Sequence, residues 1–217
     1  VTQRREVERL KNEFISTVSH ELRTPLTSIK GALGLIKGQV VGDLPGNLEA
    51  MLDIAHKNSD RLVRLINDIL DIEKIEAGKM DLQKQSLDVR TVVNDAISEI
   101  QGFAVEREIA LVIGPTYEEA RVDADADRLM QVLTNLLSNA VKFSPPGEKV
   151  EVEVARENGM IRISVVDHGP GIANDYRARI FEKFSQIDAS DSRERGGTGL
   201  GLSISKSIVE MHGGEID

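Results

Sequence analysis

The sequence predicts an α + α/β fold in which a long helical hairpin precedes an α/β domain, and three observations lead to this prediction. Apolar residues recur every three or four positions over residues 7–69, which is typical of amphipathic helices. After Gly78, short apolar segments alternate with helical ones, as they do in α/β domains. Near residue 150, valines alternate with glutamates, which predicts a strand that buries one face.

The composition excludes several classes of protein. The 217 residues carry 27 Lys and Arg against 36 Asp and Glu, a net charge of −9, so we expect no nucleic-acid partner and no attraction to anionic membranes. Cysteine is absent, which excludes disulfides, thiolate zinc sites and cysteine nucleophiles. No segment has the roughly 18 consecutive apolar residues of a membrane span, so we expect no direct membrane contact.

Two helices are predicted for the first domain, separated by a turn at residues 42–46. The first carries one apolar stripe, formed by Val7, Leu10, Phe14, Val18, Leu22, Leu26, Ile29, Leu33 and Ile36. The second has a heptad seam that a serine interrupts, formed by Leu48, Leu52, Ala55, Ser59, Leu62, Ile66 and Ile69. Two helices cannot bury both stripes alone, so we expect a homodimer that forms a four-helix bundle. In the alternative, the pair packs against the rest of its own chain.

Gly78 marks the predicted domain boundary. It stands where a glycine C-cap is expected after the second helix, and the pattern of the sequence changes beyond it. We therefore place the two domains at residues 1–78 and 79–217. The final residues, 213–217, are expected to begin a strand that is cut short.

Helices and strands alternate in the second domain. Helices are predicted to begin near Asp88 and Asp125. The dipeptide Asn158-Gly159 lies between two alternating runs and predicts a tight hairpin turn. Two further short apolar segments are expected to be strands, at residues 80–83 and 109–113.

His20 is the candidate catalytic residue of the first helix. At about 100° per residue it lies about 200° from the apolar residues two positions before and after it, so its imidazole faces away from the apolar stripe. Glu21 and Thr24 share this exposed patch, and Pro25 is expected to kink the helix beside it. An exposed histidine next to a glutamate can also be an ordinary surface pair.

A second candidate site lies on the helix that begins near residue 125. Asn135, Asn139 and Lys142 are spaced i, i+4 and i+7, so they form a polar stripe about 120° from the apolar one. Asparagine is a poor mid-helix residue, which points to a specific use. Amide oxygens are hard ligands that suit Mg²⁺, and a lysine is a point charge for phosphate. A merely polar helix face is the alternative.

Two glycine-containing segments suit contact with a nucleotide. Asp167 ends the predicted hairpin, and its carboxylate can accept a hydrogen bond from an exocyclic amine such as that of adenine. Gly169 and Gly171 would let a flat ring approach the backbone, although a simple strand-end turn explains this segment equally well. Residues 197–201 precede a helix, and glycines there expose N–H groups that suit phosphate.

The segment between the two glycine runs differs from the rest of the domain. Residues 168–198 lack periodicity except for a short apolar patch, so we expect a functional lid there. The chain contains no Walker A lysine motif, no H-R-D and no D-F-G. P-loop enzymes and eukaryotic-type protein kinases are therefore excluded.

Together these motifs closely resemble the catalytic portion of bacterial sensor histidine kinases of two-component signalling. The resemblance covers nearly the whole chain. It rests on five motifs in the right order and spacing, which are not expected together by chance. The motifs are the phospho-acceptor box at residues 20–25, the asparagine box at 135–143, the first glycine box at 167–172, the phenylalanine box at 181–186 and the second glycine box at 197–201.

The resemblance implies a dimerisation and histidine phosphotransfer domain, followed by an ATP-binding α/β sandwich of the type shared with Hsp90, DNA gyrase and MutL. In that family, Mg²⁺·ATP lies under a lid, which here would span about residues 170–198. Asn139 would ligate Mg²⁺, and Asn135 and Lys142 would lie toward the phosphates.

The resemblance assigns the remaining nucleotide contacts to other matched positions. Phe143 would lie beside the adenine ring, and Asp167 would bind its amino group. The two glycine boxes would complete the cofactor-binding site, through Gly169, Gly171, Gly197, Thr198, Gly199, Leu200 and Gly201.

The resemblance also implies the catalytic residues and the partner. His20 would take the γ-phosphoryl group of ATP, and Glu21 would hydrogen-bond its ring and raise its nucleophilicity. The phosphohistidine would pass the group to an aspartate of a response-regulator receiver domain. Thr24 would help to orient a water that removes phosphate from the regulator, so a bifunctional kinase and phosphatase is predicted. The phosphate charge could be offset by lid cations, Lys183, Arg193 and Arg195.

Two positions depart from the family pattern. Gln186 stands where many relatives carry an arginine, so the lid is expected to contact the γ-phosphate differently or more weakly. His168 stands where relatives often have Asn or Thr, which we interpret as tolerated variation.

Two alternative functions compete with the kinase. A clamp-type ATPase of the same nucleotide fold would leave His20 and the helical hairpin without a role. A non-catalytic dimeric signalling scaffold would not need the full set of ATP-contact residues that the chain carries. We expect a cytoplasmic location, either free or as the cytoplasmic portion of a membrane-anchored sensor.

Overall fold

The chain divides into two compact units, Val1–Met80 and Asp81–Asp217. The predicted boundary at Gly78 lies near this division and stays a prediction. None of the helices among the described residues is long and apolar enough to cross a membrane. The computed structural model describes residues 26–27, 29–34, 36, 46–117, 119–177, 179–183, 185 and 198–217.

Helix α2, Gly46–Glu76, dominates the first unit. It contains the whole predicted heptad seam, and Ser59 and Ile66 on that seam are buried. The hydroxyl of Ser59 is satisfied because it donates to the carbonyl of Ala55 at 3.0 Å. The predicted turn before α2 needs one correction, since Gly46 is already helical. Of the first predicted helix, the described residues are helical, namely 26–27, 29–34 and 36.

Gly78 ends α2 as predicted. Its φ of +62° is in the left-handed region, which a glycine adopts without the steric cost of a Cβ. The N–H of Gly78 donates to the carbonyl of Ile75 at 3.0 Å, and that of Lys79 donates to the carbonyl of Lys74 at 2.8 Å. These two bonds form a Schellman motif, which satisfies carbonyls at the end of the helix.

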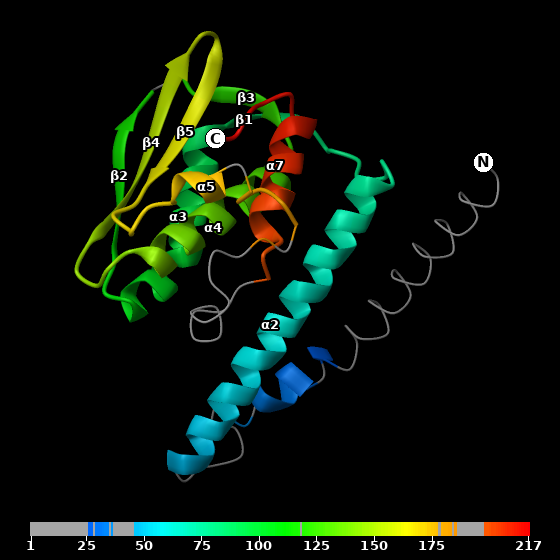
Figure 1. Ribbon diagram of the computed structural model, residues 1–217, viewed down its shortest axis with the longest axis vertical. Helices are drawn as coiled ribbons and strands as arrows, with labels where there is room; N and C mark the ends of the chain where they lie inside the picture. Colours follow the sequence, from blue (N-terminus) through cyan, green and yellow to red (C-terminus); the bar gives the residue numbers. More distant parts are fainter. Residues whose placement is uncertain are drawn as a thin grey trace, which may run out of the picture. The chain divides into compact units, whose positions relative to one another are not determined.

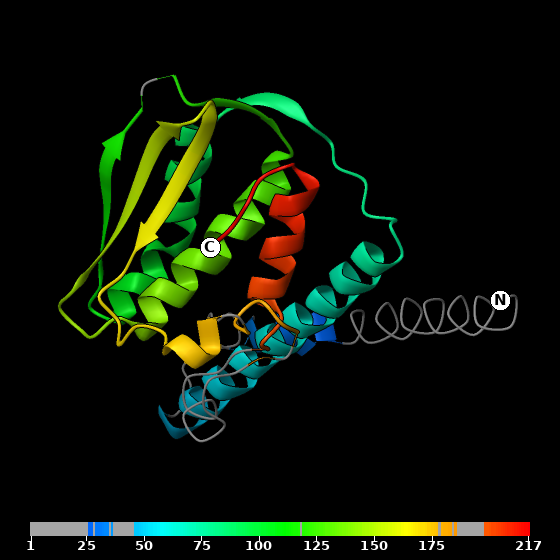
Figure 2. The same ribbon diagram turned by 45° about the horizontal axis from the view of Figure 1, so that its top comes forward.

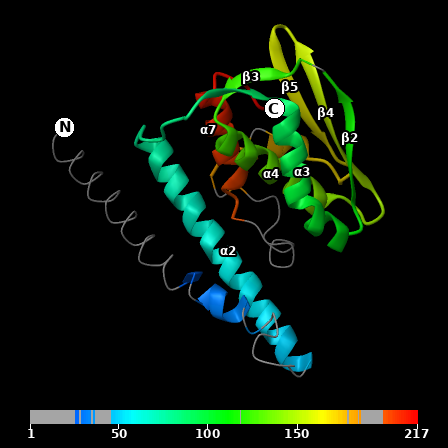
Figure 3. The same cartoon turned by 180° about the vertical axis from the view of Figure 1, so that it is seen from behind.

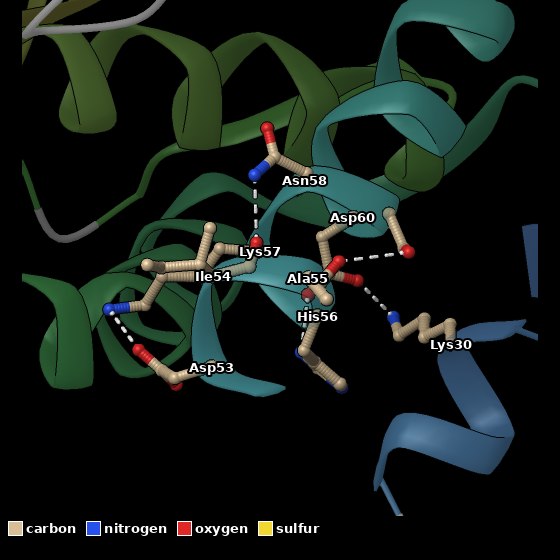
Figure 4. Close-up of polar contacts among 9 residues, drawn as sticks. Lys30, Asp53, Ile54, Ala55, His56, Lys57, Asn58 and Asp60 are labelled. Atoms are coloured by element: carbon tan, nitrogen blue, oxygen red, sulfur yellow. Dashed lines mark hydrogen bonds and ion pairs between the residues drawn. The ribbon is translucent and has the colours of Figure 1, made fainter. Parts of the chain in front are cut away.

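A polar cluster joins α2 to the helical segment that precedes it (Figure 4). Asp60 lies at its centre, with Oδ1 2.5 Å from Nζ of Lys30 and Oδ2 3.2 Å from Nδ1 of His56. One turn earlier on α2, Lys57 pairs with Asp53 at 2.9 Å. Partly exposed ion pairs contribute little each, about 0–1 kcal/mol. Their effect here is to select which faces of the two helical segments meet.

The second unit contains two sheets (Figure 1). Its strands are β1 Gln85–Asp88, β2 Ala110–Thr116, β3 Arg121–Ala124, β4 Lys149–Glu157 and β5 Met160–Val166. The larger sheet has the order β2-β4-β5, in which β2 runs parallel to β4 and β5 runs antiparallel to it. The smaller sheet is the antiparallel pair of β1 and β3.

Helices cover one face of the larger sheet (Figure 2). The helices among the described residues of this unit are α3 Val89–Glu106, α4 Ala126–Phe143, α5 Asn174–Arg177 and α7 Gly201–Met211. Helix α4 lies between α3 and α7 and contacts both (Figure 3). The core lies between the sheet and the helices α3 and α4, as in a two-layer α/β sandwich.

The predicted hairpin is confirmed. The valines of β4 that alternate with glutamates are at most 3% exposed, and they are Val150, Val152 and Val154. The turn to β5 is formed by Asn158 and Gly159, with φ values of 50° and 83°. Both residues therefore have positive φ, which is the backbone of a type I′ turn.

Two helix starts are also confirmed, while two strand expectations are wrong. Asp88 and Asp125 are the N-caps of α3 and α4, and each accepts a hydrogen bond from a backbone N–H of the first turn. Residues 80–83 form no strand, and residues 213–217 begin none. Within the predicted lid, residues 174–177 are helical, and the lid itself stays a prediction. The first strand instead lies at β1, where β3 supplies its hydrogen-bond partners.

Asp125 makes the folded second unit sensitive to acid. Burial is the largest single influence on its carboxyl and raises the pKa. The hydrogen bonds from the N–H groups of Gln83, at 2.8 Å, and Arg128, at 3.1 Å, together with the Arg128 charge, outweigh burial and lower the pKa. The stabilisation is therefore present above the unfolded pKa and is lost as the pH falls through the folded pKa.

We expect Asp125→Asn to lower the free energy of unfolding by about 1–2 kcal/mol at pH 7, because one of the two N–H donors loses its carboxylate partner. The difference in the free energy of unfolding between Asp125→Asn and wild type should shrink below about pH 4, where the wild-type carboxyl takes up a proton and loses its charge. Urea unfolding at pH 7 and pH 3 measures both effects, with the exposed Asp123→Asn as the control. An equal difference at the two pH values would contradict this account.

Candidate functional site

The polar stripe predicted on α4 is present. Asn135, Asn139 and Lys142 are half-buried on this helix. The opposite side of the helix is apolar and lies in the core, through Val132, Leu133, Leu137, Ala140 and Val141. Because core packing fixes the rotation of α4, the three polar side chains are held at the edge of the sandwich.

Asn135 connects α4 to the start of α7. Its Nδ2 donates to Oγ of Ser205 at 2.8 Å. Gly201 lies against the same side chain, so closely that a Cβ at this position would overlap with the amide oxygen of Asn135. The second glycine box therefore meets the asparagine box here. Sequence reasoning missed Ser205, because one serine among the apolar residues of a helix gives no distinctive signal.

The start of α7 offers backbone N–H groups. Its N-cap position is Leu200, which provides no side-chain cap, so the first-turn N–H groups keep their capacity to bind an anion. Gly199 has a φ of +71°, and Oγ1 of Thr198 accepts a hydrogen bond from the N–H of Leu200 at 3.2 Å. The side chain of Leu200 is fully buried, so this predicted contact residue can act only through its backbone.

The first glycine box lies against the C-terminal end of α4. Oδ1 of Asp167 accepts a hydrogen bond from the N–H of Gly169 at 2.7 Å. A Cβ at Gly169 would lie 3.0 Å from the carbonyl oxygen of Phe143 and 2.8 Å from Oδ1 of Asp167. Gly171 has a φ of +74°, which also favours glycine. Among the described residues, Oδ2 of Asp167 has no hydrogen-bond partner, so it can receive a donor from a ligand.

Phe143 presents an aromatic surface at this end of the helix. It is 42% exposed, so the ring is accessible to a ligand. Nζ of Lys142 lies 4.7 Å from the centre of its ring. The ammonium group, which the sequence predicted toward the phosphates, therefore lies over the Phe143 ring in this structure.

Asn139 lies between these two ends and fits a magnesium ion bound together with phosphates. The structure gives its side chain no hydrogen bond to any described residue, so the amide oxygen is available. Within the described residues, no three His, Cys, Asp or Glu side chains are grouped to hold a metal ion. Mg²⁺ typically takes one or two protein ligands and completes its shell with phosphate oxygens and water, which this donor set permits.

The two glycine contacts mark the ends of one elongated site. Gly201 lies at Asn135 and Gly169 lies at Phe143, and eight residues of helix separate these positions by about 12 Å. One end offers backbone N–H groups for phosphate, and the other offers an aromatic ring and a free carboxylate oxygen for a base. This spacing of contacts suits a nucleotide that lies along α4.

Only part of the predicted lid is described. Residue Phe181 of the phenylalanine box lies under Nζ of Lys206 on α7, with 5.4 Å between the ammonium and the centre of the ring. Lys183 is exposed and His168 is exposed. The remaining predicted site residues lie outside the described part of the chain and stay predictions: His20, Glu21, Thr24, Gln186, Arg193, Arg195 and Gly197.

Two family models match the chain. Residues 10–78 match the "His Kinase A (phospho-acceptor) domain". Residues 124–217 match the "Histidine kinase-, DNA gyrase B-, and HSP90-like ATPase". The second match begins just before α4 and therefore contains the asparagine box and both glycine boxes.

Similar proteins include named kinases. The chain is 42% identical to "Circadian input-output histidine kinase CikA" of Synechococcus elongatus, over 95% of the chain and 28% of that protein. It is 38% identical to "Hybrid signal transduction histidine kinase D" of Dictyostelium discoideum, over 98% of the chain and 14% of that protein. The chain thus spans less than a third of either relative.

Solved structures give the same picture. The structure of full-length ShkA in complex with AMPPNP has a TM-score of 0.72 and 32% identity, and the match covers 91% of this chain and 40% of that one. The Acinetobacter baumannii histidine kinase AdeS has a TM-score of 0.59 and 25% identity, with 88% of this chain and 86% of that one covered.

Proposed function

This chain belongs to the sensor histidine kinases and corresponds to their catalytic core, and from that membership we propose that it is an ATP-dependent protein-histidine kinase. It transfers the γ-phosphoryl group of ATP to His20 and then to an aspartate of a response-regulator receiver domain. Residues 1–78 form the dimerisation and phosphotransfer domain, and residues 79–217 form the ATP-binding domain. Because its substrate is cellular ATP, the chain works in the cytoplasm.

The observation that carries this proposal is the pair of glycine contacts along α4. A side chain at Gly201 would collide with Asn135, and a side chain at Gly169 would collide with the backbone of Phe143. Only glycine fits at either position without a shift of its neighbours. ATP has a phosphate tail and a flat base at opposite ends, which matches the groups at these two positions. The match to ShkA, whose structure contains AMPPNP, covers 91% of this chain.

Each residue of the site then has a role in holding ATP. Oδ2 of Asp167 accepts a hydrogen bond from the adenine amino group, and Phe143 packs beside the ring. The N–H groups at Gly199 and Gly201 bind the phosphate tail, together with Asn135. Asn139 would hold Mg²⁺, which supplies charge neutralisation on the phosphate oxygens when it is bound.

His20 performs the chemical step. A ring nitrogen attacks the γ-phosphorus, a nitrogen–phosphorus bond forms, and the bond to the β–γ bridging oxygen breaks so that ADP leaves. Glu21 accepts a hydrogen bond from the ring and supports the positive charge that develops there. An aspartate oxygen of the regulator then displaces the histidine nitrogen at phosphorus, which regenerates His20. Thr24 orients a water molecule that attacks the aspartyl phosphate of the regulator, so that the bond between the aspartate oxygen and phosphorus breaks and inorganic phosphate leaves. This hydrolysis is the phosphatase activity.

A homodimer is the proposed assembly. Several apolar side chains of the first unit are exposed in the single chain, and they include Met51 at 68% and Ile54 at 62%. Leu48 and Leu62 of the predicted heptad seam are exposed as well. An apolar helix surface of this kind is stabilised by burial against a second copy in a four-helix bundle.

The test is to incubate the purified chain with γ-labelled Mg²⁺·ATP and to measure the acid and base stability of the label. We expect a label that acid removes and base does not, because a phosphohistidine has this stability. His20→Gln should abolish the label and retain ATP binding, whereas Asn139→Ala should abolish the label by impairing Mg²⁺·ATP binding.

The outcomes separate the kinase from its alternatives. ATP hydrolysis without labelled protein would favour a clamp-type ATPase. Absence of any ATP binding would favour a non-catalytic scaffold. A label that survives in His20→Gln would show that another residue is the phospho-acceptor.

A further inference from the structure

His212 is bonded on both sides of its ring. It directly follows α7, and its Nε2 lies 3.0 Å from the backbone N of Asp125. Its Nδ1 lies 2.8 Å from the carbonyl oxygen of Ile208. A backbone N–H can only donate and a carbonyl can only accept, so Nε2 is the acceptor and Nδ1 carries the proton. These two bonds require the neutral Nδ1–H tautomer.

This contact lies at the far end of α7 from the nucleotide site. Helices α4 and α7 are antiparallel, since Asn135 contacts Ser205 near the start of α7 while Asp125 contacts His212 just after its end (Figure 3). Two polar contacts therefore connect the pair, one at each end of α7. The contact between Asn135 and Ser205 belongs to the proposed ATP site, whereas the contact between Asp125 and His212 lies outside it.

Asp125, which donates to His212, is itself held in place by further hydrogen bonds. Its carboxylate accepts hydrogen bonds from Gln83 and from Arg128, while its own N–H donates to His212. Nζ of Lys84 adds a bond to the carbonyl of Met211 at 3.3 Å. The end of α7 is thus tied both to the start of α4 and to the segment that leads into β1.

Apolar packing alone does not fix the register of α7. Ile204 and Ile208 are buried, but apolar contacts are non-directional and allow a helix to slide with little loss of area. Hydrogen bonds require a specific distance and direction. An 11-residue helix is about 16 Å long and nearly rigid, so a shift at His212 moves Gly201 as well.

We propose that His212 is a positioning residue for the nucleotide site: by accepting the Asp125 N–H, it holds α7 in the register that keeps Gly201 and Ser205 against Asn135. This inference rests on the proposed ATP binding and adds a residue outside the site that sets its affinity. His212 touches no part of the nucleotide and acts only through the position of α7.

The test compares two substitutions in the complete 217-residue chain, with calorimetric titration of Mg²⁺·ATP. His212→Leu removes the acceptor, and we expect the dissociation constant to rise about fivefold or more. His212→Gln places an amide oxygen near the position of Nε2, and we expect it to keep the dissociation constant within about twofold of wild type. The matched control is Ile208→Val, which removes one buried methyl group from α7 and leaves both polar contacts intact.

Three results would overturn the proposal. The first is an unchanged ATP affinity in His212→Leu while wild type binds ATP. The second is a loss of affinity in Ile208→Val as large as that in His212→Leu, which would indicate general destabilisation. The third comes from nitrogen-15 NMR of wild type, if the proton of His212 is on Nε2. If wild type itself does not bind ATP, the proposed function fails instead, and the NMR result still decides the tautomer.

Discussion

Gly201→Ala should lower the affinity for Mg²⁺·ATP about 100-fold. The added methyl group overlaps with the side-chain amide of Asn135, so either that amide rotates away from Ser205 or α7 moves outward. Overpacking of a close contact costs about 1–3 kcal/mol, and each 1.4 kcal/mol that appears in binding is a factor of ten. Both relaxations change the phosphate end of the site, so the cost should appear mainly as lost affinity.

The control for Gly201→Ala is Gly102→Ala. Gly102 lies within α3, and apart from its chain neighbours and the adjacent backbone of that helix no atom lies within 4 Å of a Cβ at that position. This control should bind ATP as wild type does, and it should unfold at a slightly higher temperature because alanine is the better helix former. Calorimetric titration of both variants gives the comparison. Wild-type affinity in Gly201→Ala would mean that phosphate does not bind at the start of α7.

Asp167→Asn should lower the affinity for ATP about 10- to 100-fold without unfolding the protein. The asparagine can keep its Oδ1 as the acceptor for Gly169, so the turn after β5 is retained. The free carboxylate oxygen is replaced by an NH₂ group, which would oppose the adenine amino group, and a hydrogen bond to a charged group contributes about 1.5–3 kcal/mol. The substitution therefore tests base recognition alone.

Two further measurements test whether the loss of affinity in Asp167→Asn is specific to recognition of adenine. His168→Asn changes the exposed neighbour of Asp167 and should leave ATP affinity as it is. GTP carries a carbonyl where ATP carries its amino group, so Asp167→Asn should weaken ATP far more than GTP. Equal losses for both nucleotides would contradict the contact between Asp167 and the adenine amino group.

Local patterns predicted much of the second unit. The N-caps Asp88 and Asp125 and the turn Asn158-Gly159 are determined by residues close in the chain, and the structure contains all three. The asparagine stripe on α4 was visible for the same reason, because its spacing and the apolar face of the helix are both local. Gly78 likewise follows from the sequence around one helix end.

Features that depend on distant residues were not predicted. The position of β1 is set by its register with β3, in which Gln85 pairs with Ala124, and no local pattern distinguishes it from residues 80–83. The bond of Ser205 to Asn135 and that of His212 to Asp125 join residues 70 and 87 positions apart. A serine and a histidine near the end of a helix have no spacing that reveals such partners.

The mixed order of the larger sheet has a consequence for how the protein folds. β4 and β5 meet across a two-residue turn, whereas β3 and α4 lie in the chain between β2 and β4, so Ala110 of β2 pairs with Lys149 of β4 across a long connection. Closing that long connection costs conformational entropy before any pairing compensates for it. We therefore expect the β4–β5 hairpin to form early and the pairing of β2 with β4 to be the slower step in refolding. The sheet is completed in an order different from that in which a ribosome synthesises its strands.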